Sequence, residues 1–161
     1  MTVVECDYVQ RPDGYDMLGA FSGNGENSFD MPMPKTCPCV MSPCLEPQKT
    51  MFYVLPHPHT PLDSSAAPAP PPAPSERLLG RGVRTRVVEG LTVGVVKFSG
   101  YATPDVVFSA RDELKAAMKR DGVPFDDSED NDNRVMIAQY NELYSLPWNR
   151  DNEVWLPVEP W

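Results

Sequence analysis

The side chains best suited to bind a metal gather in one part of the chain. Cys37, Cys39 and Cys44 lie in a proline-rich stretch, and His57 and His59 follow at i, i+2 spacing. Three thiolates would supply three of the four ligands of a structural zinc site, with Cys6 or His57 as the fourth. The spacing C-x-C-x4-C matches no familiar zinc motif, however, and the flanking prolines restrict how the backbone wraps around an ion. We therefore expect no metal site and interpret the cysteines as free thiols.

The sequence contains no arrangement of residues typical of catalysis. The patterns Gly-x-Ser-x-Gly, phosphate-binding loop and His-Glu-x-x-His are absent from it. The run Asp126, Asp127, Glu129 and Asp130 offers carboxylates, but solvated acids in a loop are poorly suited to the shifted pKa that acid–base catalysis needs. The same run lacks the central glycine and final glutamate of an EF-hand calcium loop. The sequence therefore predicts that this protein is not an enzyme.

Composition argues against two classes of partner. The 161 residues carry a net charge of -9, whereas nucleic acids and anionic membrane surfaces select clustered lysine and arginine. No apolar run approaches the roughly 20 residues that span a membrane, and the N-terminus lacks the features of a signal peptide. The crowded cysteines do not form a spaced disulfide framework. These features predict a soluble cytoplasmic protein with reduced thiols and with no nucleic-acid or membrane partner.

Residues 91–122 give the clearest structural pattern. Residues 91–98 are apolar or small on both faces, which predicts a strand inside a sheet rather than at its edge. Thr103 is suited to cap a helix through its hydroxyl, Pro104 suits the first helical position, and Gly122 ends the pattern. We therefore expect a strand, a turn and an amphipathic helix over 103–121, whose apolar face further strands must cover.

Shorter patterns on either side predict the rest of an α+β fold. Strands are expected at 2–9, 50–55, 83–88, an inner 134–140, and 153–158. A helix of about two turns is expected over 15–21, and extended edge structure over the proline-rich 29–49. A turn at Glu89 and Gly90 would pair 83–88 with 91–98. The order of elements suggests two α+β repeats that share a curved sheet.

Three segments of the chain resemble the SOUL, or haem-binding protein, family. They are the turn FSGYA at Phe98–Ala102, the segment RVMIAQYN at 134–141, and above all the closing motif LPWNRDNEVW at Leu146–Trp155. The resemblance covers residues 14–158. Compared with the family, the opening strand and helix of this chain are expected to be shortened. It implies a twisted antiparallel sheet or distorted barrel with one long helix and one short helix, in a pseudo-twofold repeat of strand-helix-strand-strand.

The resemblance also divides the chain and implies a ligand. It implies a single domain over 1–161, with a first repeat over 1–56, a proline-rich loop over 56–82 and a second repeat over 83–158. It implies a non-catalytic carrier or sensor that binds haem or a related tetrapyrrole. Haem needs an apolar slot, partners for its propionates and, optionally, an axial His, Cys, Met or Tyr ligand.

The candidate haem ligands are His57, His59 and Cys37. The two histidines lie in LPHPHTP at the start of the proline-rich loop, where exposed histidines are also common. Cys37 followed by Pro38 resembles the Cys-Pro haem-regulatory dipeptide, in which a thiolate binds ferric iron. Both assignments follow from the resemblance and the residue types alone.

The alternative is a non-catalytic interaction or structural subunit of a larger protein assembly, cytoskeletal or organellar, that keeps the family fold and has lost haem binding. The shortened first repeat favours it, because apolar surface left exposed would be covered by a partner chain in trans. Trp148 and Trp161 are the candidate interface anchors. Trp155 on the last strand is expected in the core, and Arg150 is expected to bond a nearby carboxylate or carbonyl.

Overall fold

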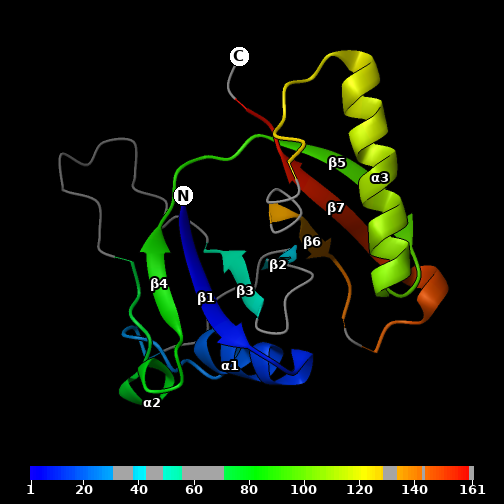
Figure 1. The fold of residues 1–161 in the computed structure, drawn as a ribbon. Helices are drawn as coiled ribbons and strands as arrows, with labels where there is room; N and C mark the ends of the chain where they lie inside the picture. The colour runs from blue at the N-terminus through cyan, green and yellow to red at the C-terminus, as the bar shows by residue number, and fades with distance from the viewer. Residues whose placement is uncertain (31–37, 43–48, 56–70, 129–133, 143, 160–161) are drawn as a thin grey trace, which may run out of the picture. The chain divides into compact units, whose positions relative to one another are not determined.

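Figure 1 shows the computed structural model of the protein, which describes residues 1–30, 38–42, 49–55, 71–128, 134–142 and 144–159. Within these residues the chain is α+β, and seven strands form a twisted antiparallel sheet that does not close into a barrel. It divides into two compact units, residues 1–36 with 52–89 and residues 37–51 with 90–161. In the part of the chain that is described, no helix combines the length and apolar character needed to cross a membrane.

The first unit is built on strand β1. β1 (Thr2–Tyr8) pairs antiparallel with β4 (Arg84–Val87), and the strand order is β4-β1-β3, where β3 is Lys49–Val54. Helix α1 (Arg11–Gly23) packs on β1 and buries Met17, Leu18 and Phe21. The single turn α2 (Glu76–Leu79) begins at Ser75, whose hydroxyl accepts a hydrogen bond from the Leu78 amide at 3.4 Å.

The second unit carries the longest helix. Its strands are β2 (Cys39–Ser42), β5 (Val93–Ser99), β6 (Met136–Gln139) and β7 (Asp151–Pro157), in the order β2-β6-β7-β5. Helix α3 (Pro104–Asp121) lies along β5 and β7 (Figure 1). A short 3-10 turn, η2 (Pro147–Asn149), lies between β6 and β7. α3 buries a stripe at helical spacing on this sheet, formed by Val107, Ala110, Leu114 and Met118.

Local signals in the sequence located most of these elements. The helix expected over 103–121 is confirmed, with Pro104 in its first turn and with Gly122 in the left-handed conformation at φ 70° that glycine tolerates. Thr103 occupies the N-cap position, but its side chain makes no capping hydrogen bond. Helix α1 is longer than the expected 15–21, because Pro12 fits the first turn of a helix and Gly14 does not stop it.

Three expectations about strand pairing were wrong. β5 is the last strand in the sheet order rather than an inner one, and β2 pairs with β6 and also neighbours β3, so it is not an edge. The hairpin between 83–88 and 91–98 does not form, because β4 pairs with β1 and β5 pairs with β7. Apolar residues occur on both faces of β5 for another reason than burial inside the sheet. α3 covers one face, and on the other face Val95 lies opposite Trp155.

Candidate functional site

The face of β5 and β7 that points away from α3 carries polar side chains beside apolar ones. A Cβ atom on Gly94 would lie 2.8 Å from the Met118 sulfur, so Gly94 faces α3. Because successive strand residues point to opposite faces, Val95 and Lys97 point the other way. The register places Trp155 opposite Val95 and Glu153 opposite Lys97, and directly opposed residues share a face. Val95 and Trp155 thus form an apolar surface next to a charged pair.

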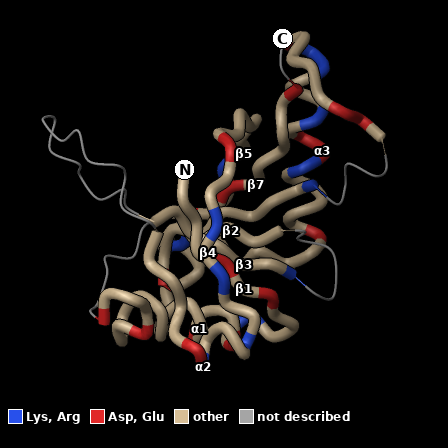
Figure 2. Tube along the Cα trace, turned by 90° about the vertical axis from the view of Figure 1, so that its left-hand side faces the viewer, with Lys and Arg blue, Asp and Glu red and all other residues tan. Residues whose placement is uncertain are grey.

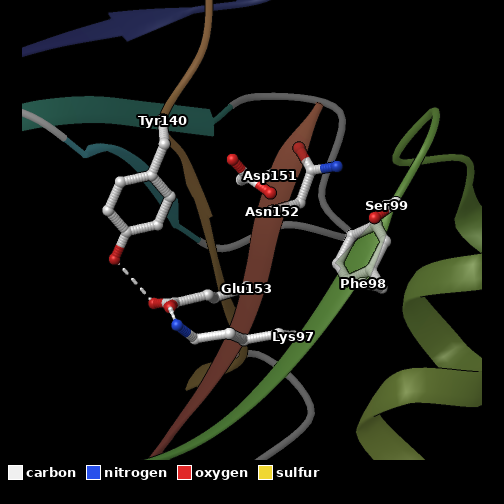
Figure 3. A pocket seen from close by; sticks show the side chains of 7 residues that line it. All are labelled: Lys97, Phe98, Ser99, Tyr140, Asp151, Asn152 and Glu153. Carbon is white, nitrogen blue, oxygen red and sulfur yellow. Dashed lines mark hydrogen bonds and ion pairs between the residues drawn. The ribbon is translucent and has the colours of Figure 1, made fainter. Parts of the chain in front are cut away.

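Glu153 is the centre of the polar part (Figure 3). The Tyr140 hydroxyl and the Trp155 ring N–H both donate hydrogen bonds to Glu153 Oε2, each at 2.7 Å. Lys97 Nζ lies 3.5 Å from Glu153 Oε1. The Glu153 residue is 8% exposed, whereas the side chain of Lys97 is 82% exposed. A nearly buried carboxylate is therefore held by two neutral donors and one solvated ammonium group.

The environment of Glu153 stabilises its charged form. Burial by itself would raise the pKa of the carboxyl, because it removes water from the anion. The hydrogen bonds from Trp155 and Tyr140, together with the positive charge of Lys97, outweigh burial and hold the pKa below its ordinary value. Glu153 is thus a carboxylate at neutral pH and serves as an acceptor and counter-ion, not as a proton donor.

A cavity of about 330 Å³ opens beside this cluster (Figure 3). Its volume is near the lower end of the roughly 300–1,000 Å³ found for small-molecule sites. Besides Glu153, Lys97 and Tyr140, its lining is formed by Phe98, Ser99, Asp151 and Asn152. The lining offers an ammonium and hydroxyl groups to an anionic or hydrogen-bonding group, and a larger apolar ligand would extend from it onto Val95 and Trp155.

Two of the three segments that carry the family resemblance meet at the rim of this cavity. The Asn152 side chain donates a 3.0 Å hydrogen bond to the carbonyl of Gly100, which has φ 95° and so favours glycine. The guanidinium of Arg150 stacks over the Tyr101 ring at 4.8 Å and donates to the Ser145 carbonyl at 2.8 Å, as expected for a structural arginine. Asn152 and Arg150 therefore fix the ends of β5 and β7, and with them the positions of Lys97 and Glu153.

The site does not bring together the residues that the sequence singled out. His57, His59, Cys37 and Trp161 lie outside the described residues, so their roles stay predictions. Trp148 is described and is 72% exposed. Among the described residues, no group of three or more histidine, cysteine or acidic side chains is placed to hold a metal ion.

Sequence reasoning missed the Glu153 cluster. The available signal was the pattern Asn-Glu-Val-Trp, which places two polar side chains in an otherwise apolar last strand. A polar residue at an expected core position needs a partner, because an unpaired buried charge is costly. The sequence could not identify that partner as Tyr140 and Lys97, which come from two other segments.

A second charged cluster lies in the first unit. The nearly buried Glu5 on β1 binds two arginines of β4, Arg84 Nε at 2.6 Å and Arg86 Nε at 2.8 Å. Arg84 also contacts Asp7 at 3.3 Å. Figure 2 shows acidic and basic positions side by side in these strands. Because each arginine already holds a carboxylate, we interpret this cluster as a bond between strands and not as a ligand site.

The comparisons with known proteins point to one family. A family model described as SOUL heme-binding protein matches residues 4–157, which include both segments that meet at Gly100 and Asn152. No curated protein matches the chain.

Proposed function

The chain belongs to the SOUL heme-binding protein family, and we propose that it binds haem or a related tetrapyrrole as a non-catalytic cytoplasmic carrier or sensor. The match over residues 4–157 is the observation that carries this proposal. A tetrapyrrole is a flat apolar ring with anionic propionates, so its site must combine an apolar surface with a cation. The described residues of the second unit offer that combination on one sheet face.

The side chains around Glu153 fit such a ligand chemically. Val95 is 42% exposed and lies opposite Trp155, so the two would support the apolar ring. The exposed Lys97 ammonium would pair with a propionate, and Ser99 would offer its hydroxyl. Bound haem would supply an iron that can change oxidation state or take up a small diatomic ligand. Glu153 would keep Lys97 in place through their ion pair.

The site offers no strong iron ligand among the residues that are described around it. Tyrosine can bind haem iron, but the Tyr140 hydroxyl already donates its hydrogen to Glu153. We therefore propose that binding rests on the ring and the propionates. His57, His59 and Cys37 remain the proposed axial ligands if one is used.

Haemin titration of the full chain tests this function. We expect a saturable Soret shift with one haemin per chain. Lys97→Gln should weaken binding by about two- to five-fold, the range of an exposed ion pair. Arg120→Gln is the matched control, because Arg120 pairs with the adjacent Asp121 at the end of α3. No Soret shift at micromolar haemin would refute haem binding, and equal effects of the two variants would refute the Lys97 site.

The axial ligands are tested in the same titration. The double variant His57→Ala/His59→Ala and the single variant Cys37→Ser should each be compared with the wild type for the position of the Soret band. A thiolate or imidazole bound to iron changes the band position when it is removed. If all three proteins give the same spectrum, these residues are not ligands.

An interaction subunit is the second candidate function, and the exposed aromatic surface around η2 favours it. Trp148, Tyr144 and Leu146 are all exposed, and Tyr101 beside them is 56% exposed. Tryptophan and tyrosine are frequent interface anchors. We propose that this surface contacts a partner chain if the protein serves in an assembly. Size-exclusion chromatography with light scattering decides between the two: a well-behaved soluble monomer counts against an obligate subunit, and self-association that Trp148→Ala abolishes supports it.

A further inference from the structure

A groove runs between β5 and the first half of α3. It encloses about 320 Å³, and the described residues that line it come from β5 and α3 alone. Phe98, Val106 and Ala110 supply its apolar lining, and Asp105, Ser109 and Glu113 line it from α3. Lys97 also lines it from β5, where its ammonium lies 3.5 Å from Glu153 Oε1. Val106 is 38% exposed although its side chain is apolar. Apolar surface is therefore exposed between α3 and β5, the last strand of the sheet.

The strand beside this groove has free backbone groups. Within the described residues, β7 is the only strand that pairs with β5. The Val158 amide donates to the Thr92 carbonyl at 3.0 Å, which fixes the hydrogen-bonding register of the two strands. Because bonded residues alternate in an antiparallel pair, Gly94, Val96 and Phe98 turn their backbone groups toward β7. The backbone N–H and C=O groups of the intervening residues therefore point outward: Val93, Val95, Lys97 and Ser99.

The charges on the helical wall are uncompensated. Neither Asp105 nor Glu113 makes an ion pair with any residue of the described chain, whereas the neighbouring Asp112 binds Arg111 at 2.7 Å. Acidic and basic positions both occur along α3 in Figure 2. Glu113 follows Asp105 by eight positions, which is about 12 Å along the helix. In an extended chain, side chains four positions apart are separated by about 13 Å and lie on the same face.

We propose that this groove binds an extended basic segment of a partner protein, which adds a strand to the free edge of β5. Main-chain hydrogen bonds to Val95 and Lys97 supply the pairing, as in other cases of strand addition. Basic side chains at positions i and i+4 of the segment meet Asp105 and Glu113, and an apolar side chain at i+2 packs on Phe98 and Val106. A second copy of this chain is the wrong occupant, because it would bring its own acidic wall and a net charge of -9.

The probe is a short fluorescent peptide, Ser-Lys-Thr-Val-Thr-Lys-Ser, which carries lysine, valine and lysine on one face of a strand. Its counterpart with glutamate in place of both lysines is the control peptide. We expect the basic peptide to bind the full chain and to protect the Val95 and Lys97 amides from hydrogen exchange. The acidic peptide should not bind. Absence of binding by the basic peptide at millimolar concentration would overturn the proposal.

Two pairs of variants separate charge from strand pairing. Glu113→Gln should weaken peptide binding by about two- to five-fold. Glu142 is an exposed carboxylate outside the groove, so Glu142→Gln should leave binding unchanged.

The second pair tests strand pairing. Val95→Pro removes one outward N–H and should weaken binding by at least about five-fold relative to Val95→Ala, which keeps this N–H. Circular dichroism checks that Val95→Pro folds. The comparison of Glu113→Gln with Glu142→Gln tests the role of charge whether or not the proline variant folds. Equal binding by the proline and alanine variants, both folded, would overturn strand addition. The experiment contains no haemin, so its result is independent of the haem titration.

Discussion

Glu153 is the residue on which the candidate haem site depends. It lies almost buried on β7 and takes two hydrogen bonds at one carboxylate oxygen, from Tyr140 and Trp155. Removing its charge leaves these donors with a weaker acceptor. We therefore expect Glu153→Gln to lower the free energy of unfolding at neutral pH by about 1.5–3 kcal/mol, the range for hydrogen bonds to a charged group. Urea unfolding followed by tryptophan fluorescence measures the difference.

The pH dependence of that difference identifies the carboxylate as its source. The pKa of Glu153 is lower in the folded protein than its ordinary value of 4.5, so the unfolded chain takes up the proton first as pH falls. The stabilisation is complete above about pH 4.5 and is lost as pH falls through the folded pKa. Wild type and Glu153→Gln should therefore converge in stability at acid pH. A gap that stays constant over the whole titration would contradict this account, and Glu142→Gln serves as the exposed control.

Cys6 is a second residue whose surroundings decide its chemistry. Burial raises the pKa of its thiol to about 12, and the nearby charge of Asp7 adds to the effect. Its Sγ donates to the Gly14 carbonyl at 3.7 Å. Because the thiolate is the reactive form, alkylation of Cys6 by iodoacetamide at mildly alkaline pH should be about a hundred- to a thousand-fold slower in the folded than in the unfolded protein. Peptide mapping by mass spectrometry measures the rate, with the half-buried Cys39 as internal control. Equal rates at Cys6 and Cys39 would contradict the prediction.

Strand β5 and helix α3 pack most closely at Gly94. A Cβ at this position would lie 2.8 Å from the sulfur of Met118 and 3.4 Å from Cδ1 of Leu114. Gly94→Val should therefore lower the free energy of unfolding by about 1–3 kcal/mol through overpacking. Adding Met118→Ala should restore part of this loss, because it removes the side chain that the valine meets. Urea unfolding tests both variants.

The control for this contact is Gly90→Val. Gly90 has no atom within 4 Å of its potential Cβ, so the same substitution there should have little effect on stability. If the effects of Gly94→Val and Met118→Ala simply add, the two residues do not compete for space. That result would mean that α3 is placed on β5 in another way.

The elements differ in how far the sequence predicted them. α3 was located because its signals are local: Pro104 starts it and the left-handed Gly122 ends it. The position of β5 at the end of the sheet was not predicted, because pairing depends on Asp151–Pro157, far along the chain. The candidate site shows the same limit. The candidate ligands His57, His59 and Cys37 can be selected from the sequence by residue type alone. Glu153, Tyr140 and Lys97 form a cluster only because the strand register brings three separate segments together.

The two units are interleaved along the chain. Residues 1–36 and 52–89 form one unit, and residues 37–51 and 90–161 form the other, so the chain passes between them three times. Strand β3 (Lys49–Val54) contributes residues to both. No single cut of the chain yields two complete units. This connectivity is the basis for our proposal that the protein is one domain and unfolds as one.

That proposal is tested with one probe in each unit. All three tryptophans belong to the second unit, and Cys6 belongs to the first. We expect the urea midpoint from tryptophan fluorescence to equal the midpoint at which Cys6 becomes accessible to pulsed alkylation, because two-state unfolding gives coincident transitions for different probes. If Cys6 is labelled at lower urea than the fluorescence changes, the first unit unfolds independently. The family fold would then be two coupled modules, and haem or a partner bound to the second unit should shift only the fluorescence midpoint.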